Sequence, residues 1–249
     1  MTPEATGELT RSRPAEVARR TRSAVRDLAA HLRLWPVAGI GLAVDLWSKQ
    51  AVFAHLHPEE IRTLVPRMLS IRRSVNPGAL FGVGQGLAPV FIGASVLALV
   101  FVLYLFWQSR PNRKSLHVGL GLILAGALGN LYDRTYHVAD AVWEDTGSVS
   151  WRGVLGRHVL FTGKLIEQTQ NSWVLGPYPD GKGRLARIPK EPNLSLGTTP
   201  VVRDFVKIEP SLGRLELWPW VFNLADAFLV AGVGLLLLNF WLDRRAAAR

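Results

Sequence analysis

The stretch APVFIGASVLALVFVLYLFWQ, residues 88–108, carries no charged side chain from end to end. A run of about 20 mostly apolar residues is long enough, as an α-helix, to cross the hydrocarbon core of a bilayer. Three further apolar blocks occupy residues 34–56, 116–132 and 221–242. Any one block could instead be a buried helix of a soluble protein, but four such blocks in one chain favour four transmembrane helices.

The composition supports this division of the chain. Of its 249 residues 49% are hydrophobic, yet the mean hydropathy is only +0.17, because polar, arginine-rich stretches separate the apolar blocks. A chain with this share of hydrophobic residues is not disordered as a whole. The absence of cysteine excludes a disulfide framework, a thiol nucleophile and a thiolate metal site. We expect no cleavable signal peptide, because the first apolar block begins late and is too long.

The formal net charge of +10 would suit a nucleic-acid-binding protein, but its distribution follows the apolar blocks. If both termini are cytoplasmic, the cytoplasmic segments carry a net charge of +8 and the outer segments +3. Arg110, Arg113 and Lys114 lie together in the short loop 109–114, as the positive-inside rule predicts for a cytoplasmic loop. The charge therefore indicates topology and attraction to membrane lipids, and no nucleic-acid partner is expected.

The sequence thus predicts an all-α polytopic membrane protein with four transmembrane helices and a small extracytoplasmic portion that contains β-strands. The strands are expected in HVLFTGKLIEQ (158–168) and SWVLG (172–176), which have the β-branched and aromatic mixture of short strands. The basic residues before position 34 form either an amphipathic helix on the inner leaflet or a solvated tail, and both readings stay open.

Polar residues converge at one membrane surface under this topology. The first helix runs outward with Asp45 and Lys49 in its outer half, and the third ends outward in GNLYDR, residues 129–134. The fourth begins at the outer face with FNLAD, residues 222–226, and SVNPGALFG, residues 74–82, precedes the second. Ionisable side chains inside a membrane are costly, so their gathering at one face points to a functional site.

Each of these residues also has a structural interpretation. Asp45 and Lys49 are four apart and can form an ion pair, and Asn223 can cap a helix. Asn130, Asp133 and Arg134 share one helix face, while Arg134 could simply anchor its helix at the interface. Asp226 lies about one turn into the fourth helix, where it could also serve as a proton-relay or ion-site residue.

Motifs for metal or nucleotide chemistry are missing from the sequence. None of the six histidines stands in HExxH or another metal-ligand spacing, and no phosphate-binding loop is present. We therefore expect neither a metal nor another cofactor.

Five motifs in order, DLWSK (45–49), VNPGALFG (75–82), GNLYDR (129–134), VRDF (202–205) and FNLAD (222–226), resemble those of the lipoprotein signal peptidases, or signal peptidase II. The resemblance covers residues 34–134 and 201–242. It implies an aspartic endopeptidase of the bacterial cytoplasmic membrane, with both termini cytoplasmic and the active site near the outer face. Such an enzyme removes the signal peptide of a diacylglyceryl-modified prolipoprotein just before the lipidated cysteine, and no obligate protein partner is implied.

The resemblance also assigns roles to residues. The catalytic pair would be Asp204, in the V-x-D-F motif, and Asp226. Residues that match the polar lining of the family's substrate site are Asn76, Asn130, Arg134 and Asn223. Residues that match supporting or structural positions are Asp45, Lys49, Gly78, Gly129, Asp133 and Ala225.

The chain departs from the family's spacing, because Asp204 follows Asp133 by about 70 residues. Residues 135–200 therefore look like an insertion, whose role as a lid, a docking surface or a neutral outgrowth is open. Asp140 lies nearer to GNLYDR, but Asp204 keeps the flanking residues of the motif and the short return to the fourth helix. The expected organisation has four parts. Residues 1–33 form a basic cytoplasmic arm, and residues 34–134 contain helices 1–3 and the outer loop 57–87. Residues 135–200 are the insertion, and residues 201–249 contain the catalytic segment, the fourth helix and a cytoplasmic tail.

Two other functions stay open at this level. A small proton-coupled membrane transporter could use Asp204 and Asp226 as relay sites, but it predicts polar residues spread through the membrane depth. A non-catalytic relative that binds lipoproteins is the other alternative, although both aspartates of the pair are present.

Overall fold

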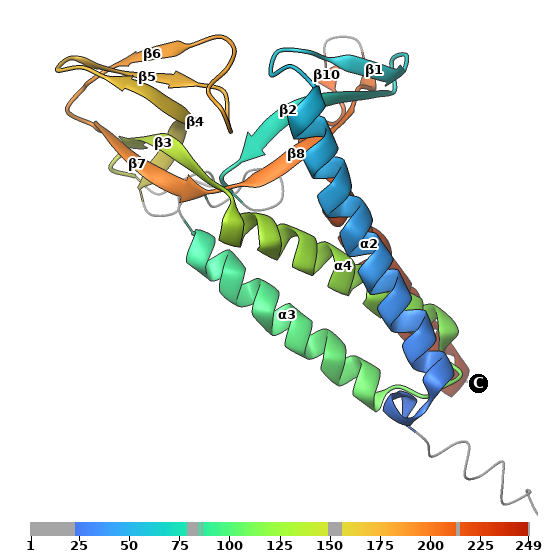
Figure 1. The fold of residues 1–249 in the computed structure, drawn as a ribbon. Helices are drawn as coiled ribbons and strands as arrows, with labels where there is room; N and C mark the ends of the chain where they lie inside the picture. The colour runs from blue at the N-terminus through green and yellow to red at the C-terminus, as the bar shows by residue number, and fades with distance from the viewer. Residues whose placement is uncertain (1–22, 79–84, 86, 149–155, 213–214, 249) are drawn as a thin grey trace, which may run out of the picture.

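The computed structural model describes residues 23–78, 85, 87–148, 156–212 and 215–248. Long helices lie together beneath two β-sheets (Figure 1). Most of the basic arm and residues 79–82 of the VNPGALFG motif lie outside the described residues.

Four long helices form the lower part of the molecule. They are α2 (Leu28–His55), α3 (Ala88–Gln108), α4 (Lys114–Tyr136) and α5 (Leu224–Ala247), and the short 3₁₀ helix η1 (Ala24–Arg26) precedes them. By length and composition, three of the four predicted transmembrane helices could cross a membrane, namely α3, α4 and α5. The first, α2, carries Asp45 and Lys49 and is not among them. α2 begins at Leu28, before the expected start at residue 34, because the Asp27 side chain caps it by accepting from Ala30 N at 2.8 Å.

The helix α4 lies at the centre of the bundle. In the most apolar stretch of α4, 67% is buried inside the protein, compared with 11% in that of α3 and 17% in that of α5. Glycines let the neighbours approach closely: a Cβ on Gly126 would lie 2.4 Å from Ala225 O, and one on Gly121 would lie 2.8 Å from Leu34 O. The outward faces of α3 and α5 are thereby left for lipid.

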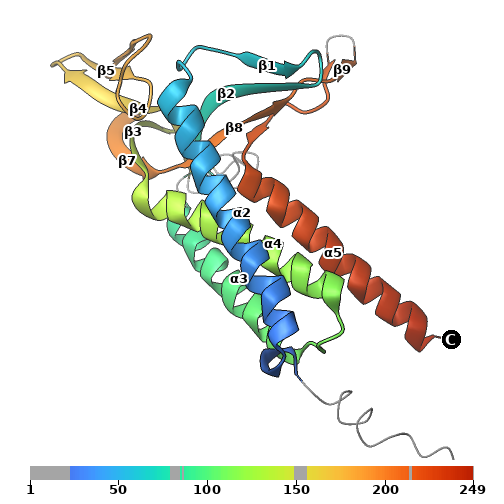
Figure 2. The same ribbon diagram turned by 45° about the vertical axis from the view of Figure 1, so that its right-hand side comes forward.

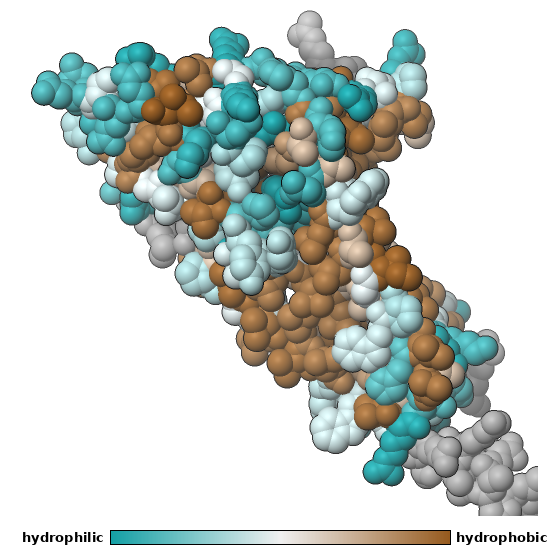
Figure 3. All heavy atoms as spheres, viewed as in Figure 1, coloured by the Kyte–Doolittle hydropathy of each residue, from teal (hydrophilic) through white to brown (hydrophobic). Residues whose placement is uncertain are grey.

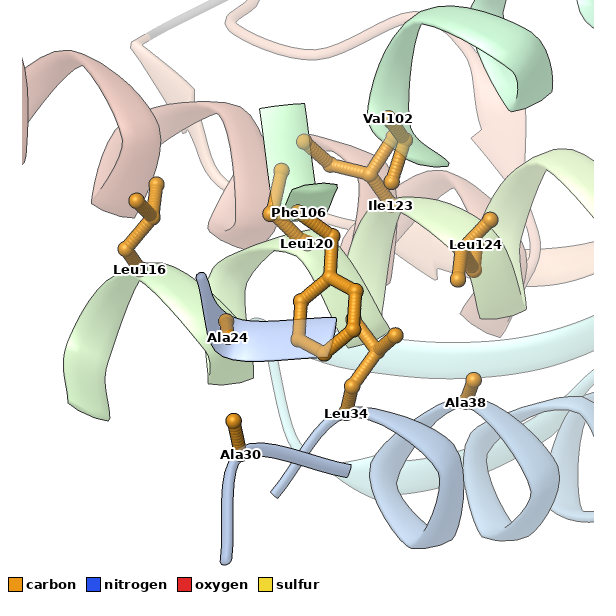
Figure 4. Close-up of a cluster of buried hydrophobic side chains, with 10 residues drawn as sticks. All are labelled: Ala24, Ala30, Leu34, Ala38, Val102, Phe106, Leu116, Leu120, Ile123 and Leu124. Carbon is orange, nitrogen blue, oxygen red and sulfur yellow. The ribbon is translucent and has the colours of Figure 1, made fainter. Parts of the chain in front are cut away.

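An apolar core fixes the end of the bundle that lies away from the sheets (Figure 4). Leu34 on α2, Phe106 on α3 and Leu120 on α4 meet there, all at most 3% exposed. Figure 3 shows hydrophobic surface over the helices below the sheets, with hydrophilic surface over the sheets and near the far end. This distribution is typical of a protein whose helices lie in a membrane. The start of α2 and the end of α5 both lie at the end away from the sheets (Figure 2).

The first sheet connects the two outer parts of the chain. Its strands are β1 (Arg62–Val65), β2 (Leu69–Asn76), β8 (Val202–Ile208) and β11 (Val221–Phe222), in that order and all antiparallel. In the central pair, Ser74 faces Asp204 and Asn76 faces Val202. A two-stranded ribbon, β9 (Ser211–Leu212) with β10 (Leu215–Glu216), follows β8.

The second sheet is built entirely from the predicted insertion. Its strands are β3 (Val138–Asp145), β4 (Arg157–Gln168), β5 (Ser172–Gly176), β6 (Ala186–Pro189) and β7 (Leu194–Pro200), in the order β6-β5-β4-β3-β7. The strands predicted at residues 158–168 and 172–176 are confirmed as β4 and β5. Val142, Trp173 and Leu175 form the buried core of this sheet.

The predicted all-α fold class is therefore wrong, because the protein is a mixed α/β membrane protein with two antiparallel sheets. The apolar blocks dominate the sequence signal, whereas most strands are short and half-exposed. Their pairing is also non-local: β2 pairs with β8 across more than a hundred residues, and β3 pairs with β7. Such pairing cannot be read from local periodicity.

Candidate active site

Polar residues from four elements meet where the first sheet joins the helices. Asp204 comes from β8, Asn76 from the end of β2, Asn130 from α4, and Asn223 and Asp226 from the start of α5. Asp204 is 2% exposed and Asp226 is 9% exposed. Residues almost 130 positions apart are thus brought into one buried cluster.

Three amide side chains hold the two carboxylates. Asn223 Nδ2 donates to Asp204 Oδ1 at 2.6 Å, and Asn76 Nδ2 donates to Asp204 Oδ2 at 3.0 Å. Asn130 Nδ2 donates to Asp226 Oδ1 at 2.8 Å, while Asn130 Oδ1 accepts from Asn223 Nδ2 at 3.2 Å. Because Asn223 reaches both Asp204 and Asn130, a single hydrogen-bond network joins the two carboxylates.

Asn223 is also the N-cap of α5. Its Oδ1 accepts from Asp226 N at 3.1 Å, and Asp226 Oδ2 accepts from Asn223 N at 3.3 Å, which forms a capping box. The capping and functional interpretations therefore coexist: the oxygen of Asn223 caps the helix and its nitrogen binds Asp204. The cap places Asp226 in the first turn of α5, where the helix dipole favours negative charge.

The environment of Asp204 favours its protonated form. Burial, reinforced by the neighbouring charge of Asp226, raises the pKa of Asp204 to about 8, although its amide hydrogen bonds act in the opposite direction. Two close carboxylates that share one proton are a common arrangement for general acid–base chemistry.

Arg134 lies beside the pair without a direct ion pair to either carboxylate. Its Nη2 donates to Gly78 O at 3.0 Å, and its guanidinium lies 5.6 Å from the centre of the Phe91 ring. Gly78 N in turn donates to Asn76 Oδ1 at 2.9 Å. Arg134 and Gly78 therefore fix the end of β2 and with it the amide that binds Asp204.

A buried ion network lies beneath the pair. Lys49 Nζ is 2.8 Å from Asp45 Oδ2 and 3.5 Å from Asp133 Oδ2, and all three side chains are fully buried. Lys49 also donates to Asn130 Oδ1 at 3.2 Å, and Asp45 Oδ1 accepts from Ala225 N at 2.8 Å. The predicted ion pair of Asp45 and Lys49 is thus present, and it links α2 to α4 and α5.

Gly129 allows this close approach. A Cβ at this position would lie 2.3 Å from Asp45 Oδ2 and 3.3 Å from the Cβ of Ala225. Any larger residue would displace the carboxylate from its position beside Lys49.

Sequence reasoning missed Arg203. Its Nη2 is 2.8 Å from Asp133 Oδ1, and its backbone N donates to Asp133 Oδ2 at 2.9 Å. Arg203 precedes Asp204 in a strand, where neighbouring side chains point to opposite faces. That alternation in VRDF could have shown that a buried cation lies behind the strand and needs an acidic partner.

A cavity of about 270 Å³ between α3, α4 and α5 is lined by Asp226 and by Asn76 and Asn130, the amides that bind the two carboxylates. Its polar wall holds Asn76, Asn130, Arg134 and Asp226, and its apolar wall includes Phe91 and Leu229. Asp140 lies elsewhere, on β3, where Oδ2 accepts from Leu165 N at 2.7 Å. The geometry therefore pairs Asp226 with Asp204 and not with Asp140.

In the part of the chain that the structure describes, no three His, Asp or Glu side chains are grouped to hold a metal ion. The fold and site define a multi-pass membrane protein with a buried, amide-bound pair of carboxylates at the edge of its apolar helices.

Comparisons with known proteins identify the family. Residues 37–242 match the family described as Signal peptidase (SPase) II. A lipoprotein signal peptidase of Desulfitobacterium hafniense is 25% identical over 212 residues, which cover 85% of this chain and 95% of that protein. One from Streptomyces griseus is 36% identical over 115 residues, which cover 45% of this chain and 56% of that protein.

A solved bacterial membrane enzyme shares the fold, with a TM-score of 0.52 and 19% identity over 84% of this chain and 87% of that one. The chain belongs to the signal peptidase II family, which confirms the resemblance carried by the five motifs.

Proposed function

We propose that the protein is an aspartic endopeptidase that cuts diacylglyceryl-modified prolipoproteins just before the lipidated cysteine, with Asp204 and Asp226 as its catalytic pair. Membership of the signal peptidase II family makes it a membrane protease that removes signal peptides from prolipoproteins. The aspartic mechanism rests on one observation: the two buried carboxylates share an amide network, part of which lines a cavity between apolar helices.

The charge balance of the site supports a shared proton. The buried carboxylates of the described residues are Asp45, Asp133, Asp204 and Asp226, and the cations around them are Lys49, Arg134 and Arg203. Four negative charges against three positive ones leave one excess negative charge, which a single proton cancels. Because Asp204 is the more deeply buried of the two, and Asp226 lies in the first turn of α5, where the helix dipole favours negative charge, we assign that proton to Asp204.

The reaction then follows general acid–base logic. Asp226 removes a proton from a water molecule, and the water oxygen bonds to the carbonyl carbon of the residue before the cysteine. Protonated Asp204 donates a hydrogen bond to the carbonyl oxygen as negative charge develops there. Asp226 returns its proton to the cysteine nitrogen as the C–N bond breaks, which releases the signal peptide acid and a free amine on the lipoprotein.

The cavity supports lateral entry of the substrate. The signal peptide helix and the acyl chains of the cysteine would come from the lipid between the helices, against Phe91 and Leu229. Asn76, Asn130 and Arg134 lie on the polar wall, where they can bind the extended backbone around the scissile bond.

The proposed location is the bacterial cytoplasmic membrane, with both termini in the cytoplasm. The ends of α2 and α5 that lie away from the sheets adjoin basic segments, in agreement with the positive-inside rule (Figure 2). The two sheets and the catalytic pair would then lie at the outer face. All four buried carboxylates of the described residues lie at this end, whereas a proton-coupled transporter would need them along the membrane depth.

The decisive experiment is cleavage of a lipidated prolipoprotein by the purified protein in detergent. Asp204→Asn and Asp226→Asn should each lose nearly all activity, and Asp140→Asn serves as the matched control that keeps it. Full activity of either pair variant would refute the aspartic mechanism. An inactive parent protein would leave only the non-catalytic lipoprotein-binding alternative.

A further inference from the structure

The insertion and the first outer segment enclose a second cavity, of about 490 Å³. Its walls include Arg73, Ser74 and Val75 of β2, and Phe161, Thr162 and Ala186 of the insertion. It lies between the two sheets: β2 belongs to the first sheet, and the sheet of the insertion lies to one side of it in Figure 1. Its volume is in the range of sites that bind small molecules or short peptide segments.

Specific contacts dock the insertion onto the rest of the protein around this cavity. Arg184 N donates to Glu59 Oε1 at 2.6 Å, and the Arg73 guanidinium donates to the backbone oxygen of Tyr178. The hydroxyl of Tyr178 is 2.9 Å from Nδ1 of His137, just beyond the end of α4. The loop after β5 is therefore tied both to the first outer segment and to the helix that carries Asn130.

The loop geometry is also fixed by close backbone packing. A Cβ on Gly176 would lie 2.2 Å from Gly181 O, and Gly181 has a φ of +75°, which favours glycine. The part of the cavity wall that this loop forms is thus fixed by the fold of the insertion.

The lining of this cavity and that of the catalytic cavity meet at neighbouring residues of β2. Ser74 and Val75 line it, while the next residue, Asn76, lines the catalytic cavity and binds Asp204. Pairing between β2 and β1 ends at Ile71, and beyond the irregularity that follows it Ser74 and Val75 pair with β8. Alternate backbone groups on the other edge of this stretch point away from β8 and can pair with an added extended segment.

The chemistry of the cleavage site identifies the occupant. The signal peptide and the acyl chains of the cysteine stay in the membrane, so the polypeptide that follows the cysteine must leave toward the sheets. The cavity lies on that route. Arg73 and Arg184 line it against one acid, Glu59, and the buried Nε of Arg73 has no hydrogen-bond partner among the described residues.

We propose that the insertion and β2 form a subsite for the first residues of the mature lipoprotein after the lipidated cysteine, bound extended along β2 with a preference for acidic side chains. This inference rests on the proposed function. It gives the insertion a role in substrate selection that the catalytic pair alone does not supply.

The test compares two lipidated substrates with the same signal peptide. The long one keeps about six mature residues after the cysteine, including acidic ones, and the short one ends directly after the cysteine. The parent protein should cleave the long substrate with a kcat/KM at least about tenfold higher. Ala186→Trp, which fills the cavity, should reduce this ratio to about threefold or less, whereas Gln168→Trp, on the exposed end of β4, should keep it.

A second variant tests the charge preference without added bulk. Arg184→Glu keeps the backbone bond to Glu59 but should shift the preference from acidic toward basic mature segments by about two- to fivefold, the size expected for an exposed charge pair. Lys182→Glu makes the same charge change in the same loop but outside the cavity lining, and should not shift the preference.

Equal kcat/KM for both substrates in the parent protein would overturn this inference while leaving the proposed function intact. Failure of the parent to cut either substrate would instead contradict the proposed function. A response of Arg184→Glu to the anionic lipid content of vesicles, and not to substrate charge, would assign the cavity to lipid headgroups and overturn the peptide subsite.

Discussion

Asp204→Asn should make the stability of the protein depend less on pH. Asp204 is 2% exposed, and burial together with Asp226 raises its pKa to about 8. In the unfolded chain an aspartate has a pKa of about 4. Between these two values the folded protein binds a proton that the unfolded chain releases, so folding is favoured at low pH and loses stability as pH rises toward 8.

The pKa of Asp204 in the folded protein limits how much stability can be lost as the pH rises. A pKa of about 8 in the folded protein and about 4 in the unfolded chain, at about 1.4 kcal/mol for each pH unit between them, sets an upper limit of roughly 6 kcal/mol for the stability lost across this range. An asparagine cannot ionise, so it removes this dependence. It also turns one of the two oxygens that accept from Asn76 and Asn223 into a donor, which costs about 1–3 kcal/mol at every pH.

The assay is thermal unfolding of parent and variant in detergent between pH 5 and 9, together with kcat/KM for a lipidated substrate. The variant should be less stable than the parent at pH 5 and equally or more stable near pH 9. Parent activity should fall about tenfold per pH unit above roughly pH 8, as Asp204 loses its proton. A stability difference that is constant with pH, or parent activity that persists to pH 10, would refute the assignment of the proton to Asp204.

Three further substitutions test the surroundings of the pair. Gly129→Ala places a Cβ 2.3 Å from a buried carboxylate oxygen of α2 and should lower the free energy of unfolding by about 1–3 kcal/mol. The control Gly234→Ala, whose Cβ would have no atom within 4 Å, should leave the stability unchanged or raise it. Equal shifts in Tm for the two variants would contradict this prediction. Arg203→Met leaves the buried carboxylate of Asp133 with fewer partners and should lower the free energy of unfolding by about 3–5 kcal/mol. A variant that unfolds at the same Tm as the parent would show that this ion pair does not stabilise the fold. Asn223→Ser keeps a side chain that can cap α5 but loses the amide that donates to Asp204 at 2.6 Å, so it should retain most of the stability while the rate of cleavage falls at least about tenfold. Asn223→Ala also loses the cap and should be about 1 kcal/mol less stable than Asn223→Ser. Unchanged cleavage in both variants would exclude a role for the amide network.

Much of the site could be predicted because its residues lie at helix ends. The direction of each apolar block places Asp45, Asn130 and Asp226 at one membrane surface, and the structure brings them into one cluster. Asp204 is separable from Asp140 by its flanking residues and by the short return to the fourth helix. Arg203 escaped prediction because its partner, Asp133, lies 70 residues away and the contact depends on how β8 packs on α4.

The sequence by itself determined the long apolar helices and their order. It also determined that basic charge is in excess beside the helix ends that lie away from the sheets, and that the polar residues lie at the opposite ends. These properties follow from local composition, since a helix satisfies its own backbone and needs only apolar side chains to enter a bilayer. The tertiary structure alone decided that the outer segments form two antiparallel sheets, that Asn223 joins the two carboxylates, and that the insertion faces β2 across a cavity. Strand pairing and amide contacts join distant residues, so their energies appear only when the whole chain has folded.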